Sequence, residues 1–422
     1  MNVWFVPSNS RHLGKFRVLL DAMIERGVQV QVLCVDSALR KRDACLHQIE
    51  AAGYDHVVLP ANDFNPDNHL FWHWFQVEPL YKAVQKALTG HEIDVLLVGG
   101  DTGVSGRTVV QAARGLGIPT TLLVDGIVLP PNRRYWPGLV NGLRDRFRVL
   151  LRSLMHVCGV RGKAGTDLVL LMNATGRDVL AADGVRPWRL RVVGSTEYDR
   201  LAADIREGKA NIDERELRAR LGIPGDKPVV FFAHHPIGLD DAGRRLLVRQ
   251  VVAGGRRAEA CVLVKFHPRS PEDPDAWRRW ADAEGMGADD VVFAKSECTS
   301  IEAIMLCSAL VTMYSTVVLE AMVAGRPLVL VQYLSTRYVL NYGSRYGAAL
   351  DAKSPEGLQE AIFRAVRDEE TRERLLRNAE KVLEREMFGM DGRSVERAIA
   401  EITALADRGI HGRPPRQQTP AR

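Results

Sequence analysis

Short apolar runs alternate with amphipathic segments along the first half of the chain. The runs have the length and the residue types of buried strands, while the amphipathic segments repeat with a helical period. The predicted strands are 2–6, 28–35, 57–59, 94–99 and 120–124, and the predicted helices are 13–26 and 104–116. This alternation predicts a doubly wound parallel sheet. Ligands bind such sheets beyond the carboxyl ends of the strands, here at 8–14, 99–103 and 125–129.

The second half repeats the pattern after a charged stretch at 204–220 and a Gly-Ile-Pro-Gly turn at 222–225. The predicted elements are strands at 228–233, 261–266, 291–293, 309–312 and 327–331, a helix at 300–306 and a helical region from 355 to 407. We therefore predict a first domain over 1–200, a linker over 201–226 and a second domain over 227–385. A helix over 386–408 and a tail over 409–422, rich in Pro, Arg and Gln, complete the chain; the tail is expected to be disordered.

Length and composition agree with a two-domain globular protein. The chain has 422 residues, of which 46% are hydrophobic and 26% charged. The net charge of +5 is too small to predict a nucleic-acid partner. No apolar run reaches eighteen residues and no basic leader precedes the first strand, so a cytoplasmic location is expected. The six cysteines have neither zinc-site spacing nor the density of a disulfide framework, and we predict no metal site.

The most informative segment runs from an apolar strand through Tyr314, Ser315 and Thr316 into a short helix that carries Glu320. A helix N-terminus presents unpaired N–H groups to an anion, and the two hydroxyls lie where a phosphate would bind. Glu320, about one turn further on, can accept hydrogen bonds from the hydroxyls of a sugar. The alternative is that the hydroxyls cap the helix and that Glu320 is a surface acid.

Two basic groups follow consecutive strands of the second half. His234 and His235 end one strand, and Lys265 and His267 end the next. At strand ends such groups can offset phosphate charge, and a histidine with an unperturbed pKa of about 6.5 suits proton donation to a leaving phosphate. Histidines bound to nearby backbone are the alternative interpretation.

Acidic and polar groups follow strands of the first half. Asp125 comes directly after a strand and before a glycine, which makes it the candidate general base, although a turn or helix cap would use the same residue. Asp101 is a second candidate acid. His12, in the loop after the first strand, could contact a phosphate or carboxylate of the substrate; helix capping is the alternative explanation for that loop.

These motifs resemble those of GT-B-fold glycosyltransferases and of the related hydrolysing UDP-N-acetylglucosamine 2-epimerases. Lys265-Phe266-His267-Pro268 resembles the His-Pro motif of bacterial sialyltransferases and polysialyltransferases and of CDP-glycerol glycerophosphotransferases. The resemblance implies an α/β GT-B fold, with two Rossmann-like doubly wound parallel-sheet domains facing a cleft and a C-terminal helix crossing back. It also implies that Ser315 and Thr316 hold phosphates and that Glu320 holds the ribose.

The resemblance further implies that His267 assists departure of the nucleotide and that Asp125 activates the acceptor hydroxyl. Only part of the acid-acid-glycine motif of polysialyltransferases is present, because Val124 precedes Asp125. Residues 99–102 resemble the Gly-Asp-Thr motif of the 2-epimerases, but 124–127 and 234–238 depart from that family. We therefore favour a transferase that binds a nucleotide sugar, inverts its anomeric centre and needs no cofactor.

Four functions remain open at this point. The preferred one is a glycosyltransferase of bacterial envelope or surface-polysaccharide synthesis, acting on a glycan or lipid-linked acceptor. The others are a 2-epimerase, a CDP-polyol phosphotransferase and a degenerate binding subunit of an envelope-synthesis complex. Residues 133–163 combine a basic face with apolar residues at helical spacing, which is typical of a helix on an anionic membrane; a helix packed on its own domain is the alternative. Contact with the inner face of the membrane is therefore one expectation.

Overall fold

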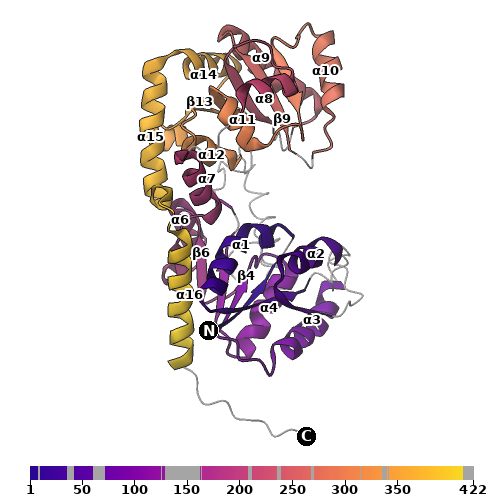
Figure 1. Ribbon diagram of the computed structural model, residues 1–422, viewed down its shortest axis with the longest axis vertical. Coiled ribbons are helices and arrows are strands. Elements are labelled where there is room, and N and C mark those ends of the chain that lie inside the picture. The colour runs from indigo at the N-terminus through magenta and orange to yellow at the C-terminus, as the bar shows by residue number, and fades with distance from the viewer. Residues whose placement is uncertain are drawn as a thin grey trace, which may run out of the picture. The chain divides into compact units, whose positions relative to one another are not determined.

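The computed structural model describes residues 1–7, 10–35, 42–59, 72–124, 126–128, 162, 164–207, 212–234, 239–267, 270–313, 315–334, 340 and 342–411. These residues form two compact units, shown in Figure 1. The first unit contains the described residues of 1–128, 162–197 and 393–411. The second contains those of 198–392. Each unit is built around one parallel sheet.

The described part of the first unit contains a seven-stranded sheet in the order β3-β2-β1-β4-β5-β6-β7. Its strands are β1 (Asn2–Val6), β2 (Gln29–Cys34), β3 (Asp55–Val58), β4 (Val95–Val98), β5 (Thr120–Leu123), β6 (Leu168–Leu171) and β7 (Leu190–Val192). Every neighbouring pair is parallel. In the centre of the sheet, Val3 of β1 pairs with Val30 of β2 and with Val95 of β4.

Helices cover both faces of this sheet because its strands are apolar on both sides. They are α1 (Ser10–Glu25), α2 (Arg42–Ala52), α3 (Trp72–Leu88), α4 (Val104–Gly115), α6 (Ala174–Ala182), η3 (Pro187–Arg189) and the start of α7 (Thr196–Arg206), followed much later by α16 (Ser394–His411). The two-residue period of β1 separates the layers: Trp4 and Val6 pack with α3 and α4, whereas Val3 and Phe5 pack with α1, α2 and α16.

The C-terminal helix α16 belongs to the core of the first unit. Ala398, Ile402 and Ala406 lie one turn apart and are buried with side chains of α1 and β1. The helix is also held by polar contacts, because Arg397 Nε donates to the carbonyl of Val193 at 2.9 Å and Glu401 pairs with Arg191 at 3.3 Å. A segment about 200 residues downstream therefore completes a face of the first sheet.

In the described part of the second unit, six parallel strands lie in the order β10-β9-β8-β11-β12-β13. They are β8 (Val229–His234), β9 (Cys261–Phe266), β10 (Val291–Ala294), β11 (Ala309–Thr312), β12 (Leu328–Val331) and β13 (Leu350–Ala352). The helices are α8 (Glu214–Leu221), α9 (Asp241–Arg257), α10 (Pro274–Ala283), α11 (Ser300–Leu306), α12 (Val317–Val323), α13 (Tyr342–Tyr346), α14 (Pro355–Arg367) and α15 (Glu369–Met387), with η4 (Phe388–Met390) after them.

One face of the second sheet is covered by α9, α10 and α14. The α9 and α14 helices approach so closely that a Cβ atom on Gly254 would lie 2.7 Å from Ile362 Cδ1 and 3.2 Å from Gln359 Cα. Only glycine therefore fits at this crossing. The close approach fixes α9 over the sheet, and α9 begins beside the carboxyl end of β8.

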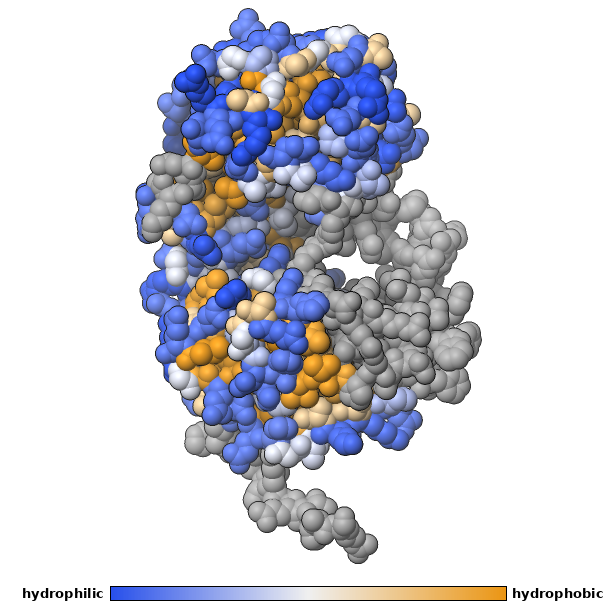
Figure 2. Space-filling view, turned by 45° about the vertical axis from the view of Figure 1, so that its right-hand side comes forward, coloured by the Kyte–Doolittle hydropathy of each residue, from blue (hydrophilic) through white to orange (hydrophobic). Residues whose placement is uncertain are grey.

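The predicted fold class is confirmed: two doubly wound parallel sheets, with a C-terminal helix packed on the first. The predicted helical region after 355 is divided into α14, α15, η4 and α16. Among the described helices, none combines the length and apolar character needed to cross a membrane. Figure 2 shows hydrophobic surface in separate patches between hydrophilic side chains. The basic segment 133–163, apart from Gly162, and the tail from 412 onward lie outside the described residues.

Replacing Ile402 by alanine should destabilise the first unit. The side chain is 0% exposed, so its loss leaves a cavity and should lower the free energy of unfolding by about 2–5 kcal/mol. Urea unfolding followed by circular dichroism would measure this. The exposed Ala404→Ser change on the same helix is the control and should cost no more than about 0.5 kcal/mol. Equal effects of the two substitutions would contradict the assignment of α16 to this core.

Candidate functional site

The order of strands reverses once in each sheet, and the carboxyl ends on either side of the reversal form the crevice where ligands bind in doubly wound proteins. In the second unit the reversal lies between β8 and β11. The strand ends there are followed by His234 and its loop on one side and by the Ser315–Thr316 turn on the other. Parallel pairing places His267, at the end of β9, on the same edge.

The hydroxyl turn leads directly into α12. Thr316 is exposed and Ser315 is half-buried, while Tyr314 lies outside the described residues. Ser315 Oγ accepts a long hydrogen bond of 3.4 Å from the backbone N–H of Val317. Thr316, the N-cap residue, has helical backbone angles and its side chain makes no capping hydrogen bond. Glu320 is half-buried on the same helix.

The N-caps of six other described α-helices of the second unit differ from that of α12. Each of six helices has an N-cap side chain that accepts a backbone N–H: Asp213 on α8, Asp240 on α9, Asp273 on α10, Thr299 on α11, Ser354 on α14 and Asp368 on α15. Capping satisfies N–H groups that the helix leaves unpaired. Thr316 makes no such bond, whereas Ser315 accepts one from the first N–H of α12. The alternative that the hydroxyls only cap the helix is therefore weakened for Thr316 alone.

His234 ends β8 but faces the core. Alternation along the strand places it on the same side as Phe232, and its ring lies edge-on to Phe266 at 4.9 Å and to Trp277 at 5.5 Å. The side chain is only 3% exposed. As the structure stands, this imidazole presents almost no surface to a ligand, and its predicted role in binding stays a prediction. His235 lies outside the described residues.

Lys265 points to the opposite face of the sheet and is 6% exposed. Its ammonium group donates to the backbone carbonyl of Lys295 at 2.9 Å, just beyond the end of β10. A buried cation needs such a partner, because burial removes its hydration. The bond also joins the ends of β9 and β10, so this lysine both carries charge and orders the edge of the sheet.

The charge of Lys265 acts on the carboxylate of Glu297. Partial burial alone would raise the pKa of Glu297, but backbone N–H groups of 295–297 and the charge of Lys265 hold the pKa below its usual value. The N–H of Lys295 donates to this carboxylate at 2.5 Å. The carboxylate is therefore ionised at neutral pH and fixes the loop after β10 beside the buried ammonium.

His267 is exposed at the end of β9 and begins the loop that leads to α10. Its carbonyl accepts a hydrogen bond from the N–H of Ser270 at 2.8 Å, and Ser270 Oγ accepts one from the N–H of Glu272 at 3.3 Å. Residues 268–269 lie outside the described part. These short-range bonds join Ser270 to both His267 and Glu272.

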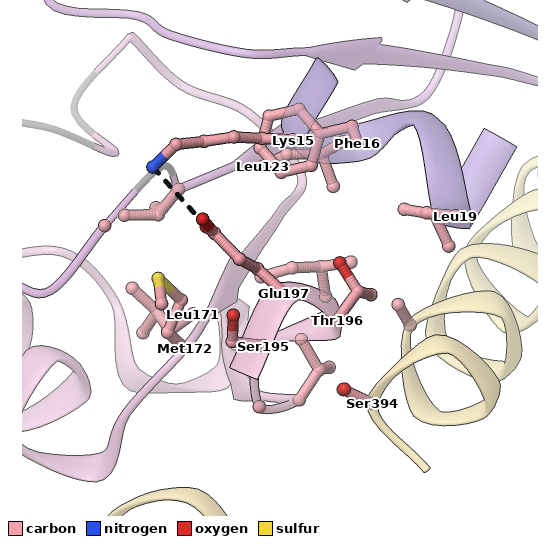
Figure 3. Close-up of a pocket in the computed structure, with 16 residues that line it drawn as sticks. Lys15, Phe16, Leu19, Leu123, Leu171, Met172, Ser195, Thr196, Glu197 and Ser394 are labelled. Carbon is pink, nitrogen blue, oxygen red and sulfur yellow. Dashed lines mark ion pairs between the residues drawn. The ribbon is translucent and has the colours of Figure 1, made fainter. Parts of the chain in front are cut away.

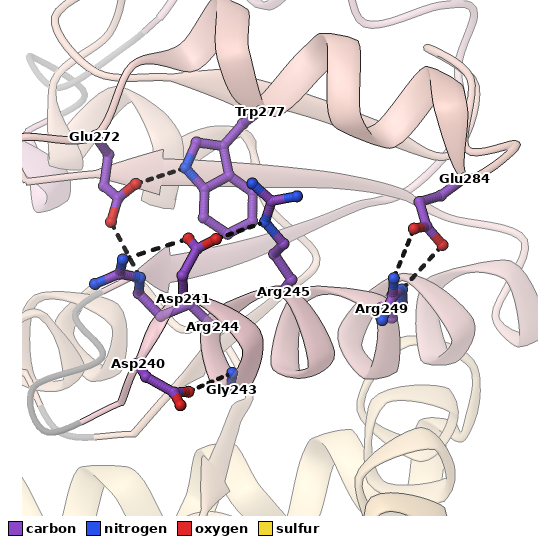
Figure 4. Close-up of polar contacts among 9 residues, drawn as sticks. All are labelled: Asp240, Asp241, Gly243, Arg244, Arg245, Arg249, Glu272, Trp277 and Glu284. Carbon is purple, nitrogen blue, oxygen red and sulfur yellow. Dashed lines mark hydrogen bonds and ion pairs between the residues drawn. The ribbon is translucent and has the colours of Figure 1, made fainter.

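Glu272 connects this loop to two helices, as Figure 4 shows. Its carboxylate accepts from the indole N–H of Trp277 at 2.6 Å and lies 3.3 Å from Arg244 Nε of α9. Its backbone carbonyl accepts from Lys295 Nζ at 3.2 Å. Lys265 binds the backbone carbonyl of the same Lys295. We call Glu272 and its partners Trp277, Arg244 and Lys295 the Glu272 cluster; through Lys295 it contacts Lys265, and through the segment that begins at His267 it is joined to that residue. Sequence reasoning did not identify Glu272, and only its three-dimensional contacts do.

The first unit has its own reversal, between β1 and β4. His12, from the first turn of α1, is buried there, and its ring packs directly on Gly99 at the end of β4. A Cβ atom on Gly99 would lie 2.1 Å from His12 Nδ1, so any larger residue would displace the imidazole. The structure thus brings two of the predicted strand-end loops together.

Asp101, in the loop after β4, is 0% exposed. Its Oδ2 accepts a hydrogen bond of 3.2 Å from the backbone N–H of Ala164, which precedes β6. The carboxylate therefore orders the backbone of the first unit, and its predicted contact with substrate stays a prediction. Asp125 lies outside the described residues, between the buried Val124 and Gly126, which has a φ of +83°.

Metal-binding clusters are missing from the portion of the chain that is described: no three His, Cys, Asp or Glu side chains gather there as metal ligands. The described cysteines Cys34, Cys261, Cys298 and Cys307 are buried free thiols. Burial raises the pKa of Cys261 to about 11, so this thiol is uncharged at neutral pH.

Part of the second unit matches the model of a known family. Residues 290–382 match the family described as glycosyl transferases group 1. The matched segment includes the hydroxyl turn, Glu320 and the strands on both sides of them. No curated protein has a sequence that matches this chain significantly.

Solved structures share the fold over nearly the whole chain. A UDP-GlcNAc 2-epimerase from Neisseria meningitidis bound to UDP-GlcNAc aligns over 96% of this chain and 100% of its own, with 13% identity and a TM-score of 0.62. The enzyme of the same name from Methanocaldococcus jannaschii, in complex with UDP-GlcNAc and UDP, aligns over 96% of this chain and 100% of its own, with 16% identity and a TM-score of 0.58. The calicheamicin glycosyltransferase CalG4 aligns over 96% of this chain and 98% of its own, with 17% identity and a TM-score of 0.55. The predicted resemblance to the GT-B superfamily is confirmed: the chain has the GT-B fold.

Replacing Glu272 by alanine should loosen the loop that carries His267. The change removes the acceptor for Trp277 and leaves Arg244 without this partner, so amide hydrogens of 267–273 should exchange at least tenfold faster. Hydrogen exchange followed by mass spectrometry measures this. Glu284→Ala is the matched control, because it breaks the exposed pair with Arg249 between the same two helices. Unchanged exchange in Glu272→Ala would show that the cluster does not order the loop.

Proposed function

We propose that this GT-B protein is a nucleotide-sugar-dependent glycosyltransferase of bacterial envelope or surface-polysaccharide synthesis. The observation that carries the proposal is that the segment matching glycosyl transferases group 1 contains the hydroxyl turn and Glu320, and that this turn lies at the strand-order reversal of the second sheet. The transferred group is a hexosyl or sialyl-type sugar, and the acceptor is a glycan or a lipid-linked glycan.

In this proposal the second unit binds the donor. Ser315 and Thr316 donate hydrogen bonds to the phosphates, and Glu320 accepts hydrogen bonds from the ribose hydroxyls. The cap of α12 supports the first assignment, because the Thr316 hydroxyl is not used by the helix. Lys265 contributes positive charge at the same edge, and His267 donates a proton or hydrogen bond to the departing nucleotide.

The acceptor side of the reaction is assigned to the first unit, with Asp125 as general base. The base takes the proton of the acceptor hydroxyl while the acceptor oxygen bonds to the anomeric carbon. The bond from that carbon to the phosphate oxygen breaks on the opposite face, and the nucleotide leaves with the electron pair. A single displacement of this kind inverts the anomeric centre. Because protein groups offset the charge of the leaving phosphate, the scheme requires neither a metal nor another cofactor.

We further propose that the enzyme acts in the cytoplasm, at the inner face of the membrane, where a lipid-linked acceptor would be available. The basic and apolar spacing of 133–163 supports this part of the proposal. Binding to anionic liposomes at low salt, and its loss at high salt, would support peripheral attachment.

A hydrolysing 2-epimerase is the second candidate. The full-length likeness of this fold to two enzymes of that name motivates a test. Incubation of UDP-N-acetylglucosamine without an acceptor should leave the sugar unchanged if the protein is a transferase, whereas an epimerised free sugar would identify an epimerase.

The nucleotide released during transfer distinguishes the remaining candidates. Release of CMP rather than a nucleoside diphosphate would identify a CDP-polyol phosphotransferase or a sialyl-type enzyme.

Replacing Glu320 by alanine should weaken nucleotide binding. Loss of hydrogen bonds to a charged group costs about 1.5–3 kcal/mol, or roughly tenfold to a hundredfold in affinity. Titration calorimetry against UDP, CDP and CMP, chosen after a thermal-shift screen, would measure the change. The exposed Glu373→Ala variant is the control and should bind normally. Absence of any nucleotide binding by the unmodified protein would overturn the proposed function.

Replacing His267 by alanine should slow transfer more than it weakens binding. A residue that assists the leaving group acts mainly in the transition state, so kcat should fall by about 10²–10⁴ while the affinity for the nucleotide changes little. His47→Ala, on the exposed surface of α2, is the control. Nucleotide release in the presence of acceptor is the assay, and an unchanged kcat would remove His267 from the mechanism.

A further inference from the structure

The first unit contains a pocket that none of the assigned roles uses. It opens at the carboxyl edge of the sheet and is formed by α1, the ends of β5 and β6, the segment after β7, and α16. All of these elements lie within the first unit as far as Glu197. The pocket is therefore a property of one compact body.

The interior of this pocket is apolar. Phe16 and Leu19 of α1, Leu171 and Met172 at the end of β6, and Ala398 of α16 supply its walls. Its volume is about 60 Å³. A cavity of about 150 Å³ lined by similar side chains holds benzene, so this one fits a smaller group, such as an acyl or alkyl group of two or three carbons.

Polar groups also line the same pocket, as Figure 3 shows. Lys15 reaches from α1 toward Glu197 at the start of α7, with 3.9 Å between Nζ and the carboxylate oxygen. The two side chains are 35% and 56% exposed, and a pair so long and so exposed contributes little to stability. Ser195 and Thr196 add hydroxyl groups to the lining. An amide or hydroxyl beside a bound apolar group would find both donors and acceptors here.

The pocket also borders the two sequence neighbours of the proposed general base. Val124 and Gly126 both belong to its lining, and Asp125 lies between them in the sequence. A substituent held in the pocket would therefore bring the rest of its molecule to the strand end that carries this acid. Such anchoring of a part that does not react is an ordinary way to orient an acceptor.

We propose that this pocket binds a short acyl or alkyl substituent of the acceptor, and that it thereby selects acceptors carrying such a group next to the attacking hydroxyl. The inference rests on the proposed function, since it names the acceptor class for that reaction. The apolar walls bind the carbon end of the substituent, and Lys15, Ser195, Thr196 and Glu197 bind its polar end.

The test uses two alanine-to-leucine changes on α16 of the full-length chain. Ala398→Leu places extra carbon atoms in the pocket wall. Ala406→Leu is the matched control, because Ala406 is buried in the same core cluster but does not line the pocket. Met172→Ala acts in the opposite direction by enlarging the pocket, and it keeps the test valid if Ala398→Leu fails to fold.

The probes are N-acetylglucosamine, N-acetylgalactosamine and their N-butanoyl forms, with glucose and galactose as probes that lack the acyl group. Saturation-transfer NMR should show the strongest contact at the acetyl methyl protons in the unmodified protein and in Ala406→Leu. The signal should fall at least tenfold in Ala398→Leu. Met172→Ala should bind the N-butanoyl probes at least tenfold more tightly than the acetyl ones.

Equal contact with glucose and N-acetylglucosamine, no contact with any acyl probe, or an unchanged signal in Ala398→Leu would each overturn the proposal. Nucleotide binding, measured on the same samples, separates this outcome from failure of the proposed function. Nucleotide binding without acyl binding rejects the pocket alone. Acyl binding without nucleotide binding rejects the proposed transferase function but supports the pocket as an acyl-binding site.

Discussion

Parallel pairing of the strands is the constraint on which the rest of this structure depends. Each crossover between parallel strands returns the chain to the same end of the sheet, so every loop that follows a strand lies on one edge. Where the strand order reverses, at β1 and β4 or at β8 and β11, adjacent loops leave in opposite directions. The candidate polar residues lie far apart in the sequence, from His12 to Glu320, and still come to lie at the carboxyl edges of the two sheets.

At the edge of the second sheet, side-chain alternation decides which groups face a ligand. His234 and Lys265 leave adjacent strands at neighbouring positions but point to opposite faces, one into an aromatic core and the other toward a backbone carbonyl. His267 lies one residue beyond the end of β9, so it does not follow the alternation of side chains along the strand, and it is exposed. Glu272, five residues further on, binds Trp277 of α10 and pairs with Arg244 of α9. The exposed side chain and the contacts that connect this segment to α9 and α10 therefore come from different residues.

Much of the fold could be predicted because its central elements carry strong local signals. The predicted segments 261–266, 300–306 and 309–312 coincide with β9, α11 and β11, each an apolar segment with polar residues or turns at its ends. The short edge strands β7 and β13 could not be predicted in this way, since three residues carry too little pattern and β13 includes Asp351. The position of candidate residues at strand ends was predictable. The Glu272 cluster was not, because it joins side chains from separate helices.

Each of the two sheets also buries an ionisable side chain near the carboxyl ends of its strands. Asp101 in the first unit and Lys265 in the second are almost completely buried. Asp101 accepts from the backbone N–H of Ala164, which precedes β6, and Lys265 donates to the backbone carbonyl of Lys295, which follows β10. A charge in this position is costly unless it is hydrogen-bonded, so its partner must be in place before any ligand arrives. The consequence in the second unit is a fixed positive charge at the edge of the sheet. A cationic edge favours an anionic ligand, so the ammonium group that orders the backbone between β9 and β10 also sets the sign of the charge that this edge can bind.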